Sequence, residues 1–232
     1  GVERVIVGER CVDRWKPAWA WTLDRKLAAK TNQFVTNNPA VRDYCAKFGL
    51  PAEKFTIIAN GVAAVSPSRV SRSQLLQELQ LPEDARLIGV IGRLWPQKRV
   101  TDLIWAADLL RVLHDNMRLL VIGDGPQRPQ LERFARLASD LDHIRFLGQR
   151  SDVERIFPHL DVLWQGSAYE GQANTVLEAM AAGVPVIASD IPGHSELVVP
   201  GETGYLVPIA ARAARVQHTD RIFGDAELSQ RM

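Results

Sequence analysis

Short apolar runs alternate with amphipathic stretches between residues 86 and 208. The predicted strands are residues 87–92, 119–122, 144–147, 161–164, 184–188 and 204–207. The predicted helices are residues 101–115, 129–140, 152–160 and 174–182. The first strand is apolar on both faces, as is typical of a strand buried in a parallel sheet. Strands that alternate with helices predict an α/β domain with a doubly wound parallel sheet and right-handed crossovers.

Two of these helices have residues that are typical of a helix end. Thr101 is the predicted N-cap of the helix at 101–115, because its hydroxyl can accept a hydrogen bond from a free amide of the first turn. Gly183 follows the helix at 174–182, at the position that favours a left-handed conformation. Ligands of doubly wound sheets bind at the carboxyl ends of the strands. Residues that directly follow a strand are therefore the first candidates for a binding site.

The first 60 residues have a different pattern. Their predicted elements are helices at 19–30 and 39–48 and strands at 33–36 and 54–58. Asn38 is the predicted N-cap of the second helix, with Pro39 at its first position. These elements are too few for an independent sheet, so we expect them to belong to a neighbouring domain whose bulk lies outside the sequence. The lack of an initiator methionine agrees with this interpretation.

The pattern divides the chain into three parts. Residues 1–60 are interpreted as the tail of an N-terminal domain with its linker, and residues 61–210 as a Rossmann-like domain. Residues 211–232 are interpreted as a C-terminal helical segment, with helices predicted at 210–216 and 225–232. The serine- and arginine-rich stretch at 66–73 is predicted to be a solvated connector.

Composition narrows the functional classes. The chain has 232 residues, of which 46% are hydrophobic and 24% charged, the values of an ordinary globular protein. The net charge of +1 gives no support to a nucleic-acid partner, although a local basic patch is compatible with it. No apolar run approaches the roughly 20 residues that a membrane span needs. Cys11 and Cys45 are too few for a disulfide framework or a zinc cluster, so we expect a reducing, cytoplasmic setting.

Two glutamates eight residues apart, Glu170 and Glu178, flank the start of the helix at 174–182. Residues 171–175 expose backbone N–H groups there, and the helix dipole favours an anion at the same place. Carboxylates on either side of an anion site suit a ligand with phosphate in the middle and hydroxyl groups at each end. A nucleotide sugar is such a ligand.

Arg93 and Lys98 lie in the loop that follows the first strand of the domain. A guanidinium can bind a diphosphate through two parallel hydrogen bonds, while an ammonium acts as a point charge. Both residues could equally be solvated surface charges, as most arginines and lysines are. Their position on the same sheet edge as the glutamates favours the binding interpretation.

The combined motifs resemble glycosyltransferase family 4, also called group 1, whose members have the GT-B fold. The motifs are Gly-Arg-Leu-x-x-x-Lys-Arg from residue 92, Val-Ile-Gly-Asp-Gly-Pro from 121, Phe-Leu-Gly from 146, Glu-Gly-x-x-Asn-x-x-x-Glu-Ala-Met-Ala-Ala-Gly-Val-Pro-Val-Ile-Ala from 170, Ser-Asp-Ile-Pro-Gly-His-Ser-Glu-Leu-Val from 189 and Gly-Glu-Thr-Gly-Tyr-Leu-Val-Pro from 201. Asn37 and Asn60-Gly61-Val62 are similar to the family's approach to its interdomain linker. The resemblance covers residues 86–208 and identifies this part as the C-terminal, donor-binding half of the fold.

The resemblance implies a role for each matching residue. Arg93 and Lys98 would stabilise the donor diphosphate, and Glu170 would contact a hydroxyl of the transferred sugar. Glu178 would bind the ribose. The other implied donor-binding residues are Gly92, Gly123 and Gly125 in the loops, Gln149 and Arg150 beside the base, and Gly171, Ala173, Asn174 and Thr175 around the phosphates. The implied reaction is retaining transfer from a nucleoside-diphosphate sugar to a glycan, lipid or small molecule.

The same resemblance has implications for cofactors and for the acceptor. No metal or other cofactor is expected, because cations and a helix start would stabilise the leaving diphosphate. The acceptor would bind mainly to the N-terminal domain that lies outside the sequence. Peripheral membrane association of a longer protein is compatible with a lipid-facing cluster of Trp15, Trp19 and Trp21, but such a cluster more often packs against a neighbouring domain. The chain by itself is expected to bind the donor weakly and to transfer little.

Two other functions fit parts of the pattern. A noncatalytic nucleotide-sugar-binding module would have the same fold, but it would have no need to keep the two cations and two glutamates together. A dinucleotide-dependent oxidoreductase also uses a doubly wound sheet, yet Gly-Asp-Gly-Pro at 123–126 lacks the third glycine of the dinucleotide fingerprint. The Asp-Leu-Asp at 140–142 and His194 are interpreted as a solvated turn and a loop residue.

Overall fold

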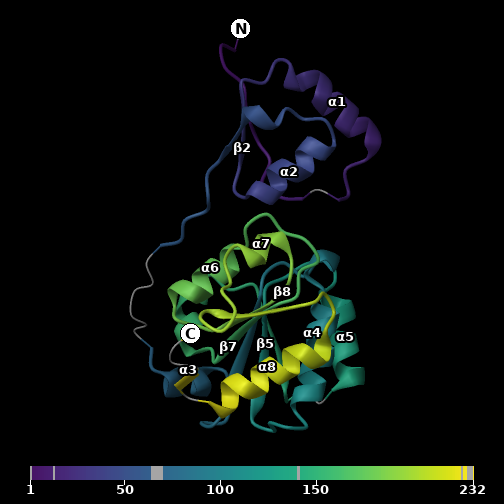
Figure 1. The fold of residues 1–232 in the computed structure, drawn as a ribbon. Helices are drawn as coiled ribbons and strands as arrows, with labels where there is room; N and C mark the ends of the chain where they lie inside the picture. The colour runs from purple at the N-terminus through teal and green to yellow at the C-terminus, as the bar shows by residue number, and fades with distance from the viewer. Residues whose placement is uncertain (1, 13, 64–69, 140–141, 226, 229–231) are drawn as a thin grey trace.

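The computed structural model describes residues 2–12, 14–63, 70–139, 142–225, 227–228 and 232. These residues form two units, each built on a parallel sheet (Figure 1). The smaller unit comes from the N-terminal segment. The larger one holds the rest of the described chain and contains the loops with the candidate residues.

The larger sheet has six parallel strands in the order β6-β5-β4-β7-β8-β9. The strands are β4 (Arg86–Ile91), β5 (Met117–Ile122), β6 (Ile144–Gly148), β7 (Val162–Gln165), β8 (Val186–Ser189) and β9 (Gly204–Val207). From the central strand β4 the chain adds β5 and then β6 toward one edge of the sheet. It then returns to the centre, where β7 pairs with the other side of β4. This reversal creates a crevice at the carboxyl ends of β4 and β7, where doubly wound proteins bind ligands.

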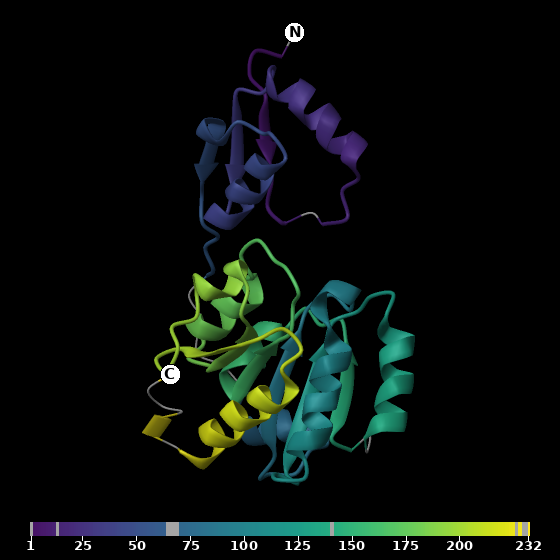
Figure 2. The same cartoon turned by 45° about the vertical axis from the view of Figure 1, so that its right-hand side comes forward.

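Helices cover both faces of this sheet (Figure 2). They are α3 (Arg72–Glu78), α4 (Val100–Leu110), α5 (Arg128–Ala138), α6 (Asn174–Ala181), α7 (Pro192–Ser195) and α8 (Arg212–Gly224). Leu110 of α4, Leu131 of α5 and Phe223 of α8 belong to one buried cluster. Leu75 of α3 and Val176 of α6 belong to the cluster on the opposite face. The predicted doubly wound α/β fold is therefore confirmed.

Several predicted elements differ in detail. Residues 152–160 form two short 3₁₀ turns, Val153–Arg155 and Phe157–His159, because Pro158 lacks the N–H that would continue an α-helix. The predicted connector at 66–73 overlaps α3, whose capping box joins Ser71 and Gln74. Its residues 66–69 lie outside the described residues.

Helix boundaries also shift. The predicted cap Thr101 lies inside α4, and Arg99 precedes this helix in a left-handed conformation with φ of 51°. The same helix ends at Leu110 rather than at residue 115. The helix predicted at 210–216 continues to Gly224 as α8, and its last turn joins the core through Ile222 and Phe223. Of the second predicted helix, at 225–232, residues 226 and 229–231 lie outside the described residues.

The N-terminal unit has a sheet of its own, contrary to the prediction that its elements are too few. The parallel strands β1 (Ile6–Gly8), β2 (Gln33–Thr36) and β3 (Phe55–Ile57) pair in that order. The helices are α1 (Ala18–Ala28) and α2 (Pro39–Lys47), with a 3₁₀ turn at Ala52–Lys54. Trp21, Phe34 and Val41 lie in a separate buried cluster. Sequence reasoning missed β1, which is only three residues long, although Val5, Ile6 and Val7 form a short apolar run.

One detail of this unit agrees with the sequence prediction. The side chain of Asn38 accepts a hydrogen bond from the N–H of Ala40 at 2.6 Å, and Pro39 opens α2. Among the described helices, none has both the length and the apolar content to cross a bilayer.

Candidate functional site

The loops after β4 and β5 lie against each other at the carboxyl edge of the sheet. Gly92 and Gly123 have φ values of +145° and +132°, which side chains other than glycine rarely adopt. A Cβ on Gly123 would lie 2.0 Å from the carbonyl oxygen of Gly92, and a Cβ on Gly125 would lie 2.6 Å from that of Leu94. Because these glycines have no side chains, the two loops lie close to the sheet edge and leave space there for a ligand.

Arg93 lies between two cavities at this edge. One cavity, of about 290 Å³, is lined by Gly92, Arg93, Gly123, Gln149 and Arg150 together with Ile91, Ile122, Asp124 and Val153. The other, of about 520 Å³, is lined by Trp15, Arg93, Trp95, Pro96, Gln97, Lys98, Tyr169 and Glu170. The Arg93 side chain is exposed and has no hydrogen bond or ion pair within the part of the chain that the structure describes. A ligand that extends from one cavity to the other would therefore meet an unpaired guanidinium.

Lys98 forms an ion pair with Glu170. The lysine lies on the 3₁₀ turn Pro96–Lys98, and its Nζ donates to Glu170 Oε1 at 2.5 Å. Ser167 Oγ donates to the same oxygen at 2.7 Å. Both charged side chains are largely shielded from solvent, with exposed fractions of 20% and 13%. Two residues 72 positions apart, both predicted as site residues, thus lie in direct contact.

His194, which sequence reasoning interpreted as a loop residue, is completely buried on α7. Its Nδ1 lies 2.8 Å from the carbonyl oxygen of Ser189, so this nitrogen carries the proton and donates it. Its Nε2 is buried without a hydrogen-bond partner among the described residues. Burial lowers the pKa of His194 to about 4, and the charges of Glu170 and Lys98 act on it in opposite directions. The side chain is therefore neutral at pH 7.

The start of α6 lies beside Glu170. Ala173 precedes the helix and is buried, and Asn174 and Thr175 are its first two residues. Glu178 lies one turn further along, half-buried, and burial raises its pKa. It lines neither of the two cavities around Arg93. The structure therefore brings Arg93, Lys98 and Glu170 together around one cavity, while Glu178 lies on α6 outside both cavities.

Arg150 lines the smaller cavity, but its charge is already balanced. Its guanidinium donates to both carboxylate oxygens of Asp152 and, at 2.8 Å, to Glu78. Asp152 and Glu78 raise the pKa of Arg150, and the hydrogen bonds from Arg150 lower the pKa of Asp152. The neighbouring Gln149 is exposed. Sequence reasoning did not foresee this pairing, because Glu78 lies 72 positions away on α3.

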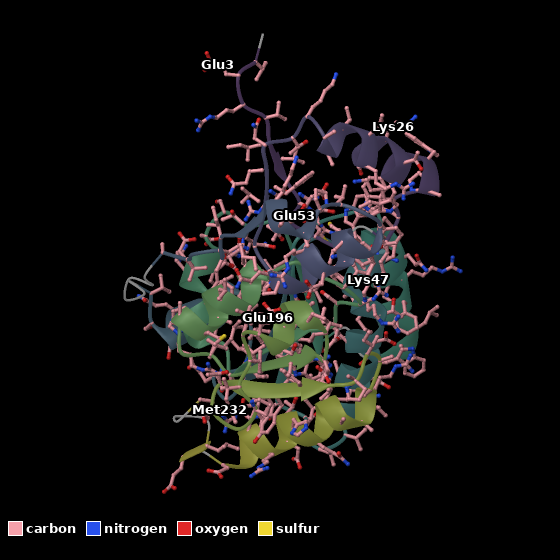
Figure 3. The ribbon with its side chains drawn as sticks, turned by 45° about the horizontal axis from the view of Figure 1, so that its top comes forward. Glu3, Lys26, Lys47, Glu53, Glu196 and Met232 are labelled. Atoms are coloured by element: carbon pink, nitrogen blue, oxygen red, sulfur yellow. The ribbon has the colours of Figure 1, made fainter. Side chains whose placement is uncertain are left out.

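A third cavity, of about 350 Å³, lies where the two units meet. It is lined by Val12, Arg14, Ala40, Asp43, Tyr44 and Lys47 from the N-terminal unit and by Ala168, Tyr169, Glu170, Ile191 and Pro192 from the larger one. Figure 3 labels Lys47 at the end of α2 and Glu196 just after α7, which mark the two sides of this contact. Glu170 thus lies between the cavity that contains Arg93 and Lys98 and the cavity shared by the two units.

Comparisons with known proteins agree with this geometry. The family model of glycosyl transferases group 1 matches residues 71–232. A GDP-mannose-dependent alpha-mannosyltransferase of Mycobacterium tuberculosis is 29% identical over 196 residues, which are 84% of this chain and 48% of that protein. A lipopolysaccharide 1,2-N-acetylglucosaminetransferase of Salmonella typhimurium is 32% identical over 192 residues, 78% of this chain and 50% of that protein. The chain spans about half the length of the curated relatives it matches.

Solved structures share the fold. A crystal structure of Anabaena HepE in complex with UDP and glucose superposes with a TM-score of 0.91 at 21% sequence identity, covering 98% of this chain and 64% of that one. The predicted GT-B architecture is thereby confirmed. Together, the six-stranded sheet, the motifs along its carboxyl edge and the family match over residues 71–232 show that this chain belongs to the group 1 glycosyl transferases.

Proposed function

We propose that this chain binds a nucleoside-diphosphate sugar and serves as the donor half of a retaining glycosyltransferase of polysaccharide or glycolipid synthesis. The observation that carries the proposal is the unpaired Arg93 guanidinium at the junction of two cavities. The smaller cavity would hold the base, and the larger one the diphosphate and the sugar. The relatives' names and the UDP in a structural neighbour support the class of donor.

The charges around the larger cavity fit the chemistry of sugar transfer. Negative charge grows on the diphosphate as the glycosidic bond breaks, through a transition state in which the sugar resembles an oxocarbenium ion. Arg93 and Lys98 would stabilise this charge from one side and the amides at the start of α6 from the other. Glu170, which now accepts from Lys98, would turn to a sugar hydroxyl. We propose that these groups act without a metal, and that transfer is insensitive to EDTA.

The acceptor would approach through the third cavity, which the N-terminal unit shares with Glu170. Arg14, Asp43 and Lys47 provide charges of both signs there, and Tyr44 and Tyr169 provide rings on which a sugar can lie. Because the chain spans about half of its relatives, we propose that acceptor binding is completed by further residues. Transfer by this chain alone is expected to be slight, and a cytoplasmic location stays a prediction.

Donor binding can be tested by thermal unfolding with UDP, GDP, ADP and NAD. A nucleotide present at about 100 times its Kd is expected to raise Tm by about 5 °C or more. Arg93→Ala should weaken that binding about 10- to 100-fold, because a charge-assisted hydrogen bond contributes about 1.5–3 kcal/mol. Arg136→Ala, which removes an exposed arginine from the last turn of α5, is the matched control and should bind normally.

The outcomes separate the three candidate functions. A response to NAD alone contradicts the proposal and favours an oxidoreductase. A response to a nucleoside diphosphate that Arg93→Ala leaves unchanged places the ligand elsewhere and also contradicts it. The noncatalytic module predicts normal binding but no transfer, even when the chain is extended to the length of its relatives.

We also propose that α1 rests on an anionic membrane. Trp19, Leu23 and Leu27 are 71%, 48% and 50% exposed, and they recur every four residues along one side of this helix. Trp15, just before the helix, is 72% exposed, whereas Trp21, the third tryptophan of the predicted surface cluster, is buried against Phe48. The exposed cations Lys26 and Lys30 lie on the same side of α1 as this stripe (Lys26 is labelled in Figure 3). The one carboxylate of α1, Asp24, pairs with Lys16. Tryptophans and leucines among cations suit the surface of a negatively charged bilayer.

Vesicle flotation tests the membrane proposal. The chain should float with vesicles of phosphatidylglycerol and phosphatidylcholine but not with phosphatidylcholine alone. Replacing Trp19 and Leu23 by serine should reduce binding about tenfold or more, since each side chain would bury apolar area worth about 1.5–3 kcal/mol. Val112→Ser, at a residue that is 77% exposed beyond α4, should have no effect. Equal binding by all three proteins would contradict the proposal.

A further inference from the structure

Asn60 connects the N-terminal unit with the loop between β7 and α6. Its Oδ1 accepts hydrogen bonds from Arg10 Nη2 at 2.6 Å and from Asn37 Nδ2 at 3.3 Å. Its Nδ2 donates to the carbonyl oxygen of Gln172 at 3.2 Å and to Asn174 Oδ1 at 2.6 Å. The acceptor end of one amide thus faces the N-terminal unit, while its donor end faces the candidate donor-binding loop.

The backbone of Asn60 adds a third bond to the same loop. Its N–H donates to Gln172 Oε1 at 2.5 Å. Gln172 is therefore held through both its main chain and its side chain, and Asn174 is the first residue of α6. The hydrogen bonds end directly at the helix start whose amides are proposed to bind the diphosphate.

A second amide holds the loop two residues earlier. Asn38 is completely buried, and while its Oδ1 caps α2, its Nδ2 donates to the carbonyl oxygen of Gly171 at 3.2 Å. The packing is equally close, since a Cβ on Gly171 would lie 1.9 Å from the carbonyl oxygen of Arg10. The loop at 170–174 is thus fixed from the N-terminal unit at Gly171, Gln172 and Asn174.

We propose that Asn60 is a positioning residue that holds the loop 170–174 in its donor-binding conformation, with Asn38 as the second attachment. The proposal rests on the proposed function, because it assumes that a diphosphate binds at the start of α6. Backbone amides bind an anion well only if they are already oriented toward it, since ordering them on binding lowers the affinity. The N-terminal unit would provide this order, so that donor affinity depends on the contact between the two units.

Replacing the side-chain amide of Asn60 by a carboxylate tests the donor end of this residue alone. Asn60→Asp keeps the shape of the side chain and the acceptor for Arg10 and Asn37. It replaces the donor by a carboxylate oxygen that faces the carbonyl oxygen of Gln172, so the side-chain bonds to the loop are lost, while the backbone N–H still donates to Gln172 Oε1. Asn38→Asp removes the bond to Gly171 and keeps the cap of α2, but it also buries a carboxylate next to Glu196, so this variant is expected to lose stability as well. Asn116→Asp is the matched control, because Asn116 donates to the carbonyl oxygen of Asp84 at the opposite edge of the sheet.

The test combines hydrogen exchange in the ligand-free chain with calorimetric titration of UDP and GDP. In Asn60→Asp and Asn38→Asp, the amides of residues 171–175 should exchange about tenfold faster, while the Tm of Asn60→Asp changes no more than that of Asn116→Asp. The Kd of the nucleotide should rise by a similar factor, because the loop is then in the binding conformation only about a tenth of the time.

Unchanged exchange and unchanged Kd in both variants would overturn the proposal. Faster exchange with an unchanged Kd would also overturn it, because the attachment would then have no effect on the donor. If the wild-type chain binds neither nucleotide, the proposed function fails, and the exchange comparison alone decides whether Asn60 and Asn38 hold the loop. The two failures are therefore distinguishable.

Discussion

Replacing Lys98 by methionine is expected to slow sugar transfer about 10²–10³-fold, the effect of removing one charge-stabilising group from an active site. The variant keeps most of the volume of the side chain and removes its charge. Lys98 is shielded from solvent, so its interaction with a diphosphate is screened far less than that of a surface lysine. Its ammonium now pairs with Glu170 and would be drawn to the leaving group as negative charge develops there.

The measurement is kcat and kcat/KM for the chain extended to the length of its relatives, with and without EDTA. A loss in kcat with a smaller change in KM indicates an interaction made in the transition state. Arg136→Ala, which removes a cation at the exposed end of α5, should have normal rates. A Lys98→Met variant that raises KM but keeps kcat would show that Lys98 only holds the donor. Loss of wild-type transfer with EDTA would contradict the metal-free mechanism.

The architecture followed from local patterns. Apolar runs and amphipathic stretches predicted all six strands of the larger sheet, because the central strands are buried on both faces and the crossover helices have an apolar side. β1 and α3 were missed for a shared reason. β1 is three residues long, and α3 has only seven residues next to a serine- and arginine-rich stretch, although its buried Leu75 and Leu76 and the capping box of Ser71 and Gln74 signal a helix. Short elements depend on contacts that local sequence does not show.

The sequence predicted which residues lie at the candidate site, but not the ion pairs and hydrogen bonds that they form with one another. Arg93, Lys98 and Glu170 each follow a predicted strand in the sequence. Because parallel strands end at the same edge of a sheet, the sequence predicted that these residues lie close together, and they line one cavity. The ion pair between Lys98 and Glu170 and the neutralisation of Arg150 by Asp152 and Glu78 depend on distances between segments far apart in sequence. The bonds of Asn60 to the loop are of the same kind, joining residues 112 and 114 positions apart.

Lowering the pH from 7 to 4 is expected to remove about 3 kcal/mol of unfolding free energy through His194 alone. The side chain is fully buried, and burial lowers its pKa from 6.5 to about 4. In the unfolded chain the imidazole binds a proton below pH 6.5, whereas in the folded protein it does so only near pH 4. The unfolded state therefore binds more protons between these values. Stability is complete above pH 6.5 and is lost as the pH falls toward 4.

Other groups near His194 and elsewhere titrate in the same range, so the comparison must be made against a variant. The charges that act on His194 are those of Glu170, Lys98 and Arg215. His218, whose pKa is also lowered by burial, contributes a slope of the same sign, while Glu178, whose pKa is raised, contributes the opposite one. His194→Asn removes the titrating ring and leaves these groups in place. Its amide can still donate to the carbonyl oxygen of Ser189.

Urea unfolding at pH 7, 6, 5 and 4 measures the difference. The variant should be less stable than the wild type at pH 7, because a smaller side chain leaves a cavity, but its stability should fall by about 3 kcal/mol less between pH 7 and pH 4. Parallel curves for the two proteins would mean that His194 titrates normally when folded. In that case burial would not oppose protonation of His194, and the imidazole would become charged below about pH 6.5 in the folded protein as it does in the unfolded chain.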